Sequence, residues 1–336
     1  MSKEADAVKG LYFPVLDHGF VALVDYMGDD AAIVQAARCS YGAGTKKLSE
    51  DRDLIRYLLR HKHTTPFEMV ELKFHVKLPI FVARQLIRHR TASVNEYSMR
   101  YSLPPMQFYV PGYDNTGVQS KKNKQGRAVP VSPEQYNEFL LHWEMLQKNS
   151  VELYEMMVSE KVDLARELAR LHLPLSIYTE WYWKIDLHNL LGFLRLRVDK
   201  HAQWEIQQVS QLKARICNLV APNATEGWID YMHQAKTFSR MEMQLLRSML
   251  VAVQVNADLD SKEKRPKLIS TGASATSSAL TGGFGMGKRE TDEFMALFEP
   301  SEEDPFAPFD LSLDTSLGKP GSYFEELAKS YLPKTL

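Results

Sequence analysis

The side chains best suited to chemistry gather between positions 88 and 100. This segment, RHRTASVNEYSMR, places cations at both ends around Ser93, Asn95, Glu96 and Ser98. A core strand would alternate apolar and polar residues, and a solvated helix would set Glu against Lys or Arg at four-residue spacing; the segment does neither. Guanidinium groups bind phosphate through paired hydrogen bonds, and short polar side chains give that binding direction. The segment predicts a loop that binds an anionic ligand, with a structural salt-bridge loop as the alternative.

The distribution of charge favours a small phosphorylated ligand. Residues 257–336 carry 9 Lys and Arg against 14 Asp and Glu, which leaves 32 of the chain's 41 basic residues and 28 of its 42 acidic residues before them. Binding to duplex nucleic acid usually requires a concentrated basic face. This mild positive balance therefore does not predict nucleic acid as a partner.

Cysteine usage and hydropathy indicate a cytoplasmic protein. Cys39 and Cys217 stand far apart without Cys-x-x-Cys spacing, so neither a disulfide framework nor a thiolate metal site is predicted, and each is expected to be a small core residue. No apolar segment opens the chain, and no run of 18 apolar residues occurs. No membrane role is expected.

The elements that must position the segment are strands with a period of two and helices with apolar residues at 3.6-residue spacing. We expect loops at His61–Glu68, where Pro66 disfavours helical geometry for the residue before it, and at the polar stretch Pro111–Pro130. The fold class is α/β, in an α+β arrangement, with a mixed central sheet and a long helical section. Strands are predicted at Phe20–Asp25, Val70–Leu78, Phe108–Val110 and Ser176–Ile185, and helices at Asp30–Arg38, Asp51–Lys62, Pro79–Arg88, 133–161, 163–172, Leu187–Val198, 199–220, 225–235 and 239–253.

The composition changes near Asn256. Residues 270–287 are rich in Ser, Thr, Gly and Ala, and residues 290–314 hold nine acidic side chains and no basic one. Such segments bury too little apolar area to offset chain entropy. We therefore predict a folded domain over 1–256 and a largely disordered tail over 257–336. Phenylalanines among the acids of 290–314 leave open a docking segment for an unidentified partner, beside the simpler interpretation as a solvated tail.

The segment 88–100 resembles the complete signature of the flavin-dependent thymidylate synthases. Arg88-His89-Arg90-x-x-Ser93-x-Asn95-Glu96-x-Ser98-x-Arg100 fills every fixed position. The resemblance covers roughly residues 18–250 and does not include the tail. Further segments similar to the family occur in the family's order at Ala36–Ser40, His63–Glu68, Phe81–Gln85, Leu173–Thr179 and Phe193–Ile206.

The resemblance implies an enzyme, a methyltransferase that moves the methylene of 5,10-methylenetetrahydrofolate to C5 of dUMP and so makes dTMP. In the family, FAD reduced by NADPH supplies the hydride, and no enzyme cysteine acts as a nucleophile. The family also implies a homotetramer whose active sites draw on several subunits.

The resemblance assigns contacts to individual residues. Arg197 is the catalytic residue, because its permanent charge would stabilise uracil as N3 loses its proton. Arg100 and Arg170 would hold the phosphate of dUMP. The full dUMP set is Gln85, Arg88, Glu96, Ser98, Arg100, Arg170 and Arg197, and the FAD set is Ser40, His63, Thr65, Arg88, His89, Arg90, Glu96, Asp186, His188 and Gly192.

Several of these positions depart from the family pattern or also suit a purely structural role. Gly192 stands where family members usually carry Asn or His close to the flavin, so that contact lacks a side chain here. Asp186 also suits the N-cap of the helix from Leu187. His61 and His63 have no acidic or histidine partner at metal-ligand spacing, so no metal is predicted.

Two other functions fit the same cations. A binding module for RNA or nucleotides would hold phosphates without turnover, and the protein would be colourless. A flavoprotein oxidoreductase acting on another acceptor would be yellow and would oxidise a nicotinamide cofactor without making dTMP.

Overall fold

The computed structural model describes residues 2–39, 51–121, 125–249, 288–295, 297 and 308–319. The chain forms two compact units. The first holds Met1–His233 and Phe309–Leu336, and the second holds Gln234–Pro308. The predicted division at residue 256 stays a prediction, because residues 250–287 lie outside the described ranges.

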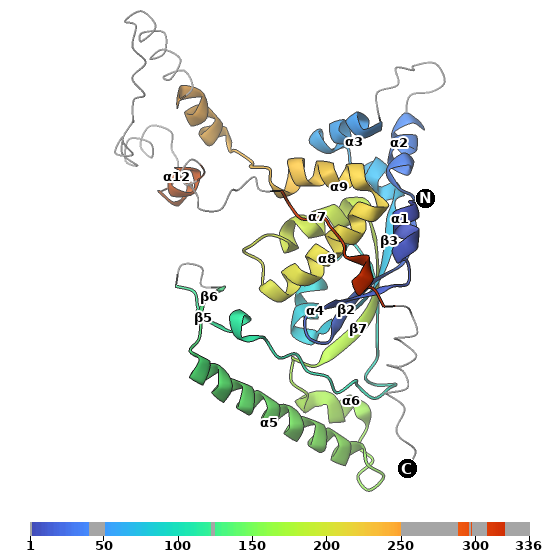
Figure 1. Ribbon diagram of the computed structural model, residues 1–336, viewed down its shortest axis with the longest axis vertical. Coiled ribbons are helices and arrows are strands. Elements are labelled where there is room, and N and C mark those ends of the chain that lie inside the picture. The colour runs from blue at the N-terminus through green and yellow to red at the C-terminus, as the bar shows by residue number, and fades with distance from the viewer. Residues whose placement is uncertain are drawn as a thin grey trace, which may run out of the picture. The chain divides into compact units, whose positions relative to one another are not determined.

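A five-stranded sheet forms the centre of the first unit (Figure 1). Each neighbouring pair of strands is antiparallel. The α+β class is therefore confirmed, whereas the sheet expected to be mixed is antiparallel throughout its described strands. In order across the sheet, the strands are β1 (Tyr12–Val15), β2 (Gly19–Met27), β3 (Glu71–Pro79), β7 (Tyr178–Asp186) and β4 (Ser93–Glu96).

Strands β3 and β7 pair without interruption, from Glu71 opposite Asp186 to Pro79 opposite Tyr178. Successive side chains of a strand point to opposite faces, so alternate residues share one face of the sheet. One face is mainly apolar and buried, and its largest side chains on these two strands are Trp181, Trp183 and Phe74.

Helices cover this apolar face (Figure 1). Helix α4 (Ile80–Leu86) packs on β3, α7 (Leu187–Arg197) on β7 and α8 (Trp204–Val220) on β2. The other described helices near this core are α1 (Lys3–Val8), α2 (Asp30–Cys39), α3 (Asp51–Arg60) and α9 (Pro222–Trp228). None of the described helices is both long and apolar enough to cross a membrane.

Helix α5 (Pro133–Val158) lies at the other end of the unit (Figure 1). It begins at a capping box in which Ser132 and Gln135 satisfy each other's backbone N–H groups. The helix predicted over 163–172 is two short pieces, α6 (Arg166–Ala169) and the 3-10 turn η3 (Arg170–His172), which pack on α5. These pieces carry Arg170.

All three predicted loops contain ordered elements. The segment 88–101 includes the edge strand β4, whose residues are all exposed and therefore show no apolar alternation. The stretch 111–130 includes a hairpin of β5 (Gly117–Gln119) and β6 (Arg127–Pro130). Shorter differences are the turns η1 (Thr65–Met69), η2 (Tyr113–Asn115) and η4 (Ile229–His233), the end of α4 at Leu86, and a single bridge from Phe108 to Ile177 in place of a strand at Phe108–Val110.

Part of the predicted tail lies against the first unit. In this segment, residues 309–319, here called the C-terminal strap, Lys319 exchanges two backbone hydrogen bonds with Tyr12 of β1 (3.0 and 3.1 Å). Phe309 packs edge-on against Trp228 and His233, with ring centroids 5.7 and 4.9 Å apart. Apolar residues at 309, 311 and 313 contact the core, so these residues are ordered.

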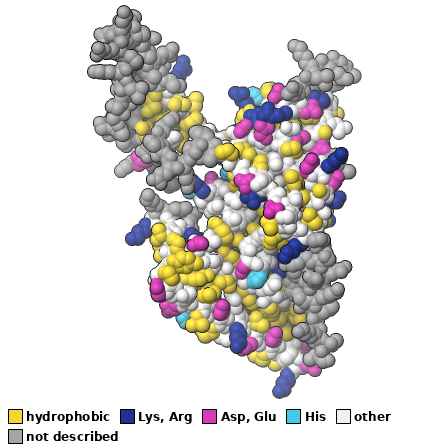
Figure 2. Space-filling model, viewed as in Figure 1, with side chains coloured by type: hydrophobic (Ala, Val, Ile, Leu, Met, Phe, Trp, Pro, Cys, Tyr) yellow, Lys and Arg dark blue, Asp and Glu magenta, His cyan; other side chains and the backbone are white. Residues whose placement is uncertain are grey.

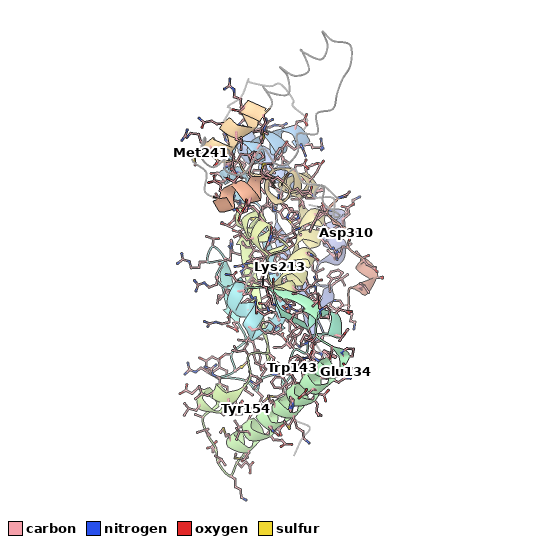
Figure 3. The ribbon with its side chains drawn as sticks, turned by 90° about the vertical axis from the view of Figure 1, so that its left-hand side faces the viewer. Glu134, Trp143, Tyr154, Lys213, Met241 and Asp310 are labelled. Atoms are coloured by element: carbon pink, nitrogen blue, oxygen red, sulfur yellow. The ribbon has the colours of Figure 1, made fainter. Side chains whose placement is uncertain are left out.

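The second unit is small. Its described helices are residues 240–249 and α12 (Lys288–Met295). Leu245 and Phe294 form its buried cluster, with Met241, labelled in Figure 3, packed beside them.

Candidate functional site

The signature segment crosses the edge of the sheet. After α4 the chain turns and forms β4, which pairs with β7 from Ser93 opposite Lys184 to Glu96 opposite Trp181. Thr179 on β7 donates a hydrogen bond of 2.7 Å to Glu96 Oε1. Strand pairing therefore separates the first cations of the signature from its last one.

His89, in the first half, rests against the aromatic core. Its ring lies 5.5 Å from Phe193 and 6.3 Å from Trp183, centroid to centroid, and Nε2 lies 3.0 Å from Thr91 Oγ1. Burial lowers the pKa of His89, and the nearby charge of Arg197 lowers it further. The imidazole is therefore neutral at neutral pH and offers one donor and one acceptor.

Helix α7 carries three of the predicted residues, His188, Gly192 and Arg197, and a fourth, Asp186, is its N-cap. Asp186 caps it by accepting hydrogen bonds from Asn189 N (2.9 Å) and Nδ2 (2.6 Å), so the capping interpretation holds for this carboxylate. Nothing lies within 4 Å of the place where a Cβ on Gly192 would stand. Gly192 therefore leaves open space beside α7, where a larger side chain would also fit.

The second half of the signature meets the arginines of α6 and η3. Ser98 Oγ accepts a hydrogen bond from Arg100 N (3.3 Å), and Arg100 Nη2 lies 2.9 Å from Glu167 Oε2. Arg166 donates to the carbonyl of Tyr101 at 2.9 Å. These contacts bring Ser98 and Arg100 to the short helical segment that continues into Arg170.

His63 and Thr65 line a cavity of about 700 Å³. Its wall includes residues of α2 and α3, together with Met69 of η1. η1 packs on α7, and Leu187 N donates to the carbonyl of Val70 at 2.8 Å. The histidine and threonine are therefore placed near the start of α7. Ser40, predicted with them, lies outside the described residues.

The structure does not bring all predicted residues together in one chain. Helices α2 and α3 lie at one end of the first unit, whereas α5 and α6 lie at the other, with the sheet between them (Figure 1). His63 and Thr65 belong to the first end, and Ser98, Arg100 and Arg170 to the second.

Several arginines of the site have no protein partner. Within the described ranges, the side chains of Arg88, Arg90, Arg170 and Arg197 form no hydrogen bond or ion pair. Other arginines of the unit, such as Arg52 and Arg127, pair with carboxylates. Unpaired guanidinium groups close to one signature are typical of a site that binds anions.

The two cysteines differ from each other. Cys217 is fully buried, and burial raises the pKa of its thiol to about 12, so it is a core residue as expected. Cys39 is exposed at the end of α2, so the expectation of a core residue is wrong there. Among the described residues, no group of His, Cys, Asp or Glu is arranged to hold a metal ion.

The sequence missed a buried polar cluster next to the site. Gln85 on α4 donates a hydrogen bond to Gln203 Oε1, and Gln203 donates in turn to Glu205. Glu205 also accepts from Tyr109 and Arg127. Glu205 follows Gln203 in a segment already similar to the family, which was a usable signal, but Arg127 lies among other cations of a polar stretch.

Comparison with known families gives one match over most of the folded unit. Residues 22–223 match the family model described as "Thymidylate synthase complementing protein". A flavin-dependent thymidylate synthase of Gluconobacter oxydans is 49% identical over 257 residues, which cover 75% of this chain and 84% of that protein. The enzyme of the same name from Ruegeria pomeroyi is 52% identical over 250 residues, covering 73% and 82%.

A solved structure has the same fold. The UMP/dUMP methylase PolB from Streptomyces cacaoi, bound with 5-Br UMP, is 33% identical and superimposes with a TM-score of 0.59. The superposition covers 66% of this chain and 98% of that one.

Proposed function

This chain belongs to the family of flavin-dependent thymidylate synthases, which are methyltransferases, and we propose that it makes dTMP by reductive methylation of dUMP. 5,10-Methylenetetrahydrofolate is the one-carbon donor, and FAD reduced by NADPH is the hydride source. The reaction uses no cysteine nucleophile and takes place in the cytoplasm. The related Streptomyces cacaoi methylase was solved with 5-Br dUMP, which supports a uridine nucleotide as the substrate.

The residues present fit a flavin. The cavity beside His63 and Thr65 is large, and Gly192 leaves open space on α7, which packs against η1 at the cavity wall. When bound, the flavin supplies a hydride. Arg88 and Arg90 neutralise its pyrophosphate, neutral His89 gives one hydrogen bond, and the remaining contacts fall to Ser40, Glu96, Asp186 and His188.

The residues at the other end of the unit bind dUMP. Arg100 and Arg170 hold the phosphate through guanidinium forks, and the Ser98 hydroxyl adds a donor. Arg100 must leave Glu167 or share it, since the two side chains are paired at 2.9 Å and about half exposed. An exposed pair of this kind is weak, so a phosphate dianion displaces the carboxylate.

Arg197 is the proposed catalytic residue. It is half-buried at the end of α7, and its nearby positive charge, after burial, contributes to lowering the pKa of His89. A guanidinium cannot lose its proton at neutral pH, so it stabilises the anionic form of the uracil base and raises electron density at C5.

The observation that carries this function is the set of arginines without protein partners. Unpaired cations near a surface are suited to bind anions. The ligands of the family carry two anionic groups, the phosphate of dUMP and the pyrophosphate of FAD. The proposed FAD residues His63 and Thr65 lie at one end of the first unit, and the dUMP residues Arg100 and Arg170 lie at the other. This separation supports active sites completed by neighbouring subunits, and we propose a homotetramer. Hydrophobic side chains gather on the visible face of the molecule (Figure 2). On α5, Leu141 is 64% exposed and Leu146 57% exposed.

None of the residues proposed to bind dUMP or FAD lies beyond position 256, so we place catalysis in residues 1–256. We assign no catalytic role to residues 257–336. The acidic segment 290–314 remains a candidate docking site for an unidentified protein.

One assay tests the proposal. The purified protein should be yellow, and dTMP should form only with dUMP, methylenetetrahydrofolate and NADPH together. Arg197→Ala should lower dTMP formation at least about 100-fold while flavin stays bound. Arg195→Ala, two residues earlier on α7 and exposed, is the matched control and should keep its activity. A colourless protein would refute the proposal, and a yellow one that oxidises NADPH without making dTMP would indicate another acceptor.

A further inference from the structure

A buried carboxylate joins three parts of the first unit. Glu205, in the first turn of α8, has a side chain only 2% exposed. It accepts hydrogen bonds from Tyr109 Oη (3.0 Å), from Arg127 Nη2 to both oxygens (2.7 Å each) and from Gln203 Nε2 (2.9 Å). An ionised carboxylate has acceptors only, so these donors compensate its removal from water.

Arg127 brings the β5–β6 hairpin to this carboxylate. It is the first residue of β6, and its other terminal nitrogen donates to the backbone carbonyl of Asn115 ahead of β5. Arg127 and Glu205 also line a cavity of about 470 Å³ together with Trp143 of α5. One side chain therefore ties the beginning of β6 and the residues ahead of β5 to α8.

The charge of Glu205 sets the direction of two amides. Because Glu205 only accepts, Gln203 must turn its NH₂ group towards it. The carbonyl oxygen of Gln203 then faces Gln85 and accepts from its NH₂ group. As a result, Gln85 Oε1 faces away from Gln203 and is available to a ligand, beside the second hydrogen of the same amide nitrogen.

We infer that Arg127 and Glu205 are positioning residues for the substrate site, acting through Gln203 to hold Gln85 with its carbonyl oxygen towards dUMP. This role rests on the proposed function, in which Gln85 contacts the nucleotide. It specifies the chemistry of the contact. The nucleotide group opposite Gln85 is a hydrogen-bond donor, either a sugar hydroxyl or the N3–H of uracil.

Steady-state kinetics with varied dUMP tests the role. Arg127→Met should raise the KM for dUMP about tenfold, roughly one hydrogen bond, and change kcat much less. Arg127→Lys restores the charge without the forked hydrogen bonds, so its KM for dUMP should lie between those of the wild type and Arg127→Met. The matched control is Arg52→Met. Arg52 also makes a forked pair, with Glu226 at 2.8 and 2.5 Å. This pair is exposed and lies on α3, at the other end of the first unit from the proposed dUMP residues. The KM of this variant should equal that of the wild type.

Two more variants separate positioning from folding. Gln203→Met breaks the relay and leaves the Arg127–Glu205 pair in place, so it should raise the dUMP KM to the same extent with normal flavin content. Glu205→Gln keeps the shape but presents an amide in either orientation, so it should raise the KM as well. An unchanged KM in folded, flavin-loaded Arg127→Met and Gln203→Met overturns this role alone. A wild type that makes no dTMP overturns the proposed function, and this role with it.

Discussion

Helix α8 buries two residues of opposite charge in different ways. Glu205, in the first turn, receives donors from three other residues, one each from the stretch before η2, the hairpin and the turn that starts the helix. Lys213, about two turns later, is fully buried, and in the described part of the chain its Nζ has no hydrogen-bond partner. One charge is satisfied by polar atoms and the other is not.

Lys213, labelled in Figure 3, is buried against three aromatic rings. Its Nζ lies 3.8 Å from the ring centroid of Trp183, 5.2 Å from that of Phe193 and 5.6 Å from that of Phe74. Such rings attract a cation, yet they replace only part of its hydration. Burial therefore lowers the pKa of Lys213 well below its usual value.

The difference shows what keeps a buried charge. A carboxylate that meets a guanidinium and two further donors has its lost hydration replaced, and it orients the side chains around it. An amine enclosed by rings alone gives up its proton, or costs folding free energy to keep it. The two residues should therefore respond to removal with opposite signs.

Replacing Glu205 should have the largest effect. Glu205→Leu leaves Arg127, Tyr109 and Gln203 without their acceptor, so the free energy of unfolding should fall by about 3–5 kcal/mol in denaturant titrations. Glu226→Leu removes a carboxylate from an exposed arginine pair and should cost far less. Equal losses in the two variants would show that Glu205 is no more than an ordinary ion-pair partner.

Lys213 should respond in the other direction. Lys213→Met fills the aromatic cage with a side chain of similar length and no charge, so the free energy of unfolding at pH 7 should rise by about 1–4 kcal/mol. A loss of stability would mean that the ammonium gains more from the three rings than it loses in hydration.

The pH dependence of this gain distinguishes the charge from the packing. Below the usual lysine pKa of about 10.4, the unfolded chain binds a proton at Lys213 that the folded chain binds more weakly. The wild type therefore gains stability as pH rises through the window between the lowered folded pKa and the unfolded value. The advantage of Lys213→Met should shrink as pH approaches that value. A constant advantage at every pH would assign it to packing.

Patterns within a short stretch of sequence predicted the parts of the fold that one element determines alone. Leu72, Phe74 and Val76 alternate with polar residues, and the strand predicted there is β3. The apolar spacing of α7 and its N-cap Asp186 were predicted in the same way. The signature at 88–100 identified the family, because its residue types are mostly uncommon and their spacing is strict.

Contacts between distant residues could not be predicted in this way. Arg127 and Glu205 are 78 positions apart, and nothing in a polar stretch with several lysines marks this arginine as the one that is held. Lys213 occupies an apolar position of α8, and the helix was predicted from the remaining pattern. The strand β4 was missed since both of its faces are exposed, so pairing with β7 rather than side-chain pattern defines it.

Arg215, the third charged residue of α8 in this comparison, is expected to give the smallest effect. Arg215 contacts Asp310 of the C-terminal strap, with Nη2 3.2 Å from Oδ2, and this carboxylate lies at the edge of the unit (Figure 3). Water solvates both partners, so Asp310→Asn should leave the midpoint of thermal unfolding nearly unchanged, and any small difference should vanish in high salt. Phe309→Ala, which removes the ring packed on Trp228, should lower the midpoint more, because aromatic contacts of this kind contribute about 0.5–1.5 kcal/mol beyond the area they bury. If Asp310→Asn lowered the midpoint more than Phe309→Ala, the strap would be held mainly by charge. Solvent exposure would then not explain why the ion pair of Arg215 contributes less stability than that of Glu205.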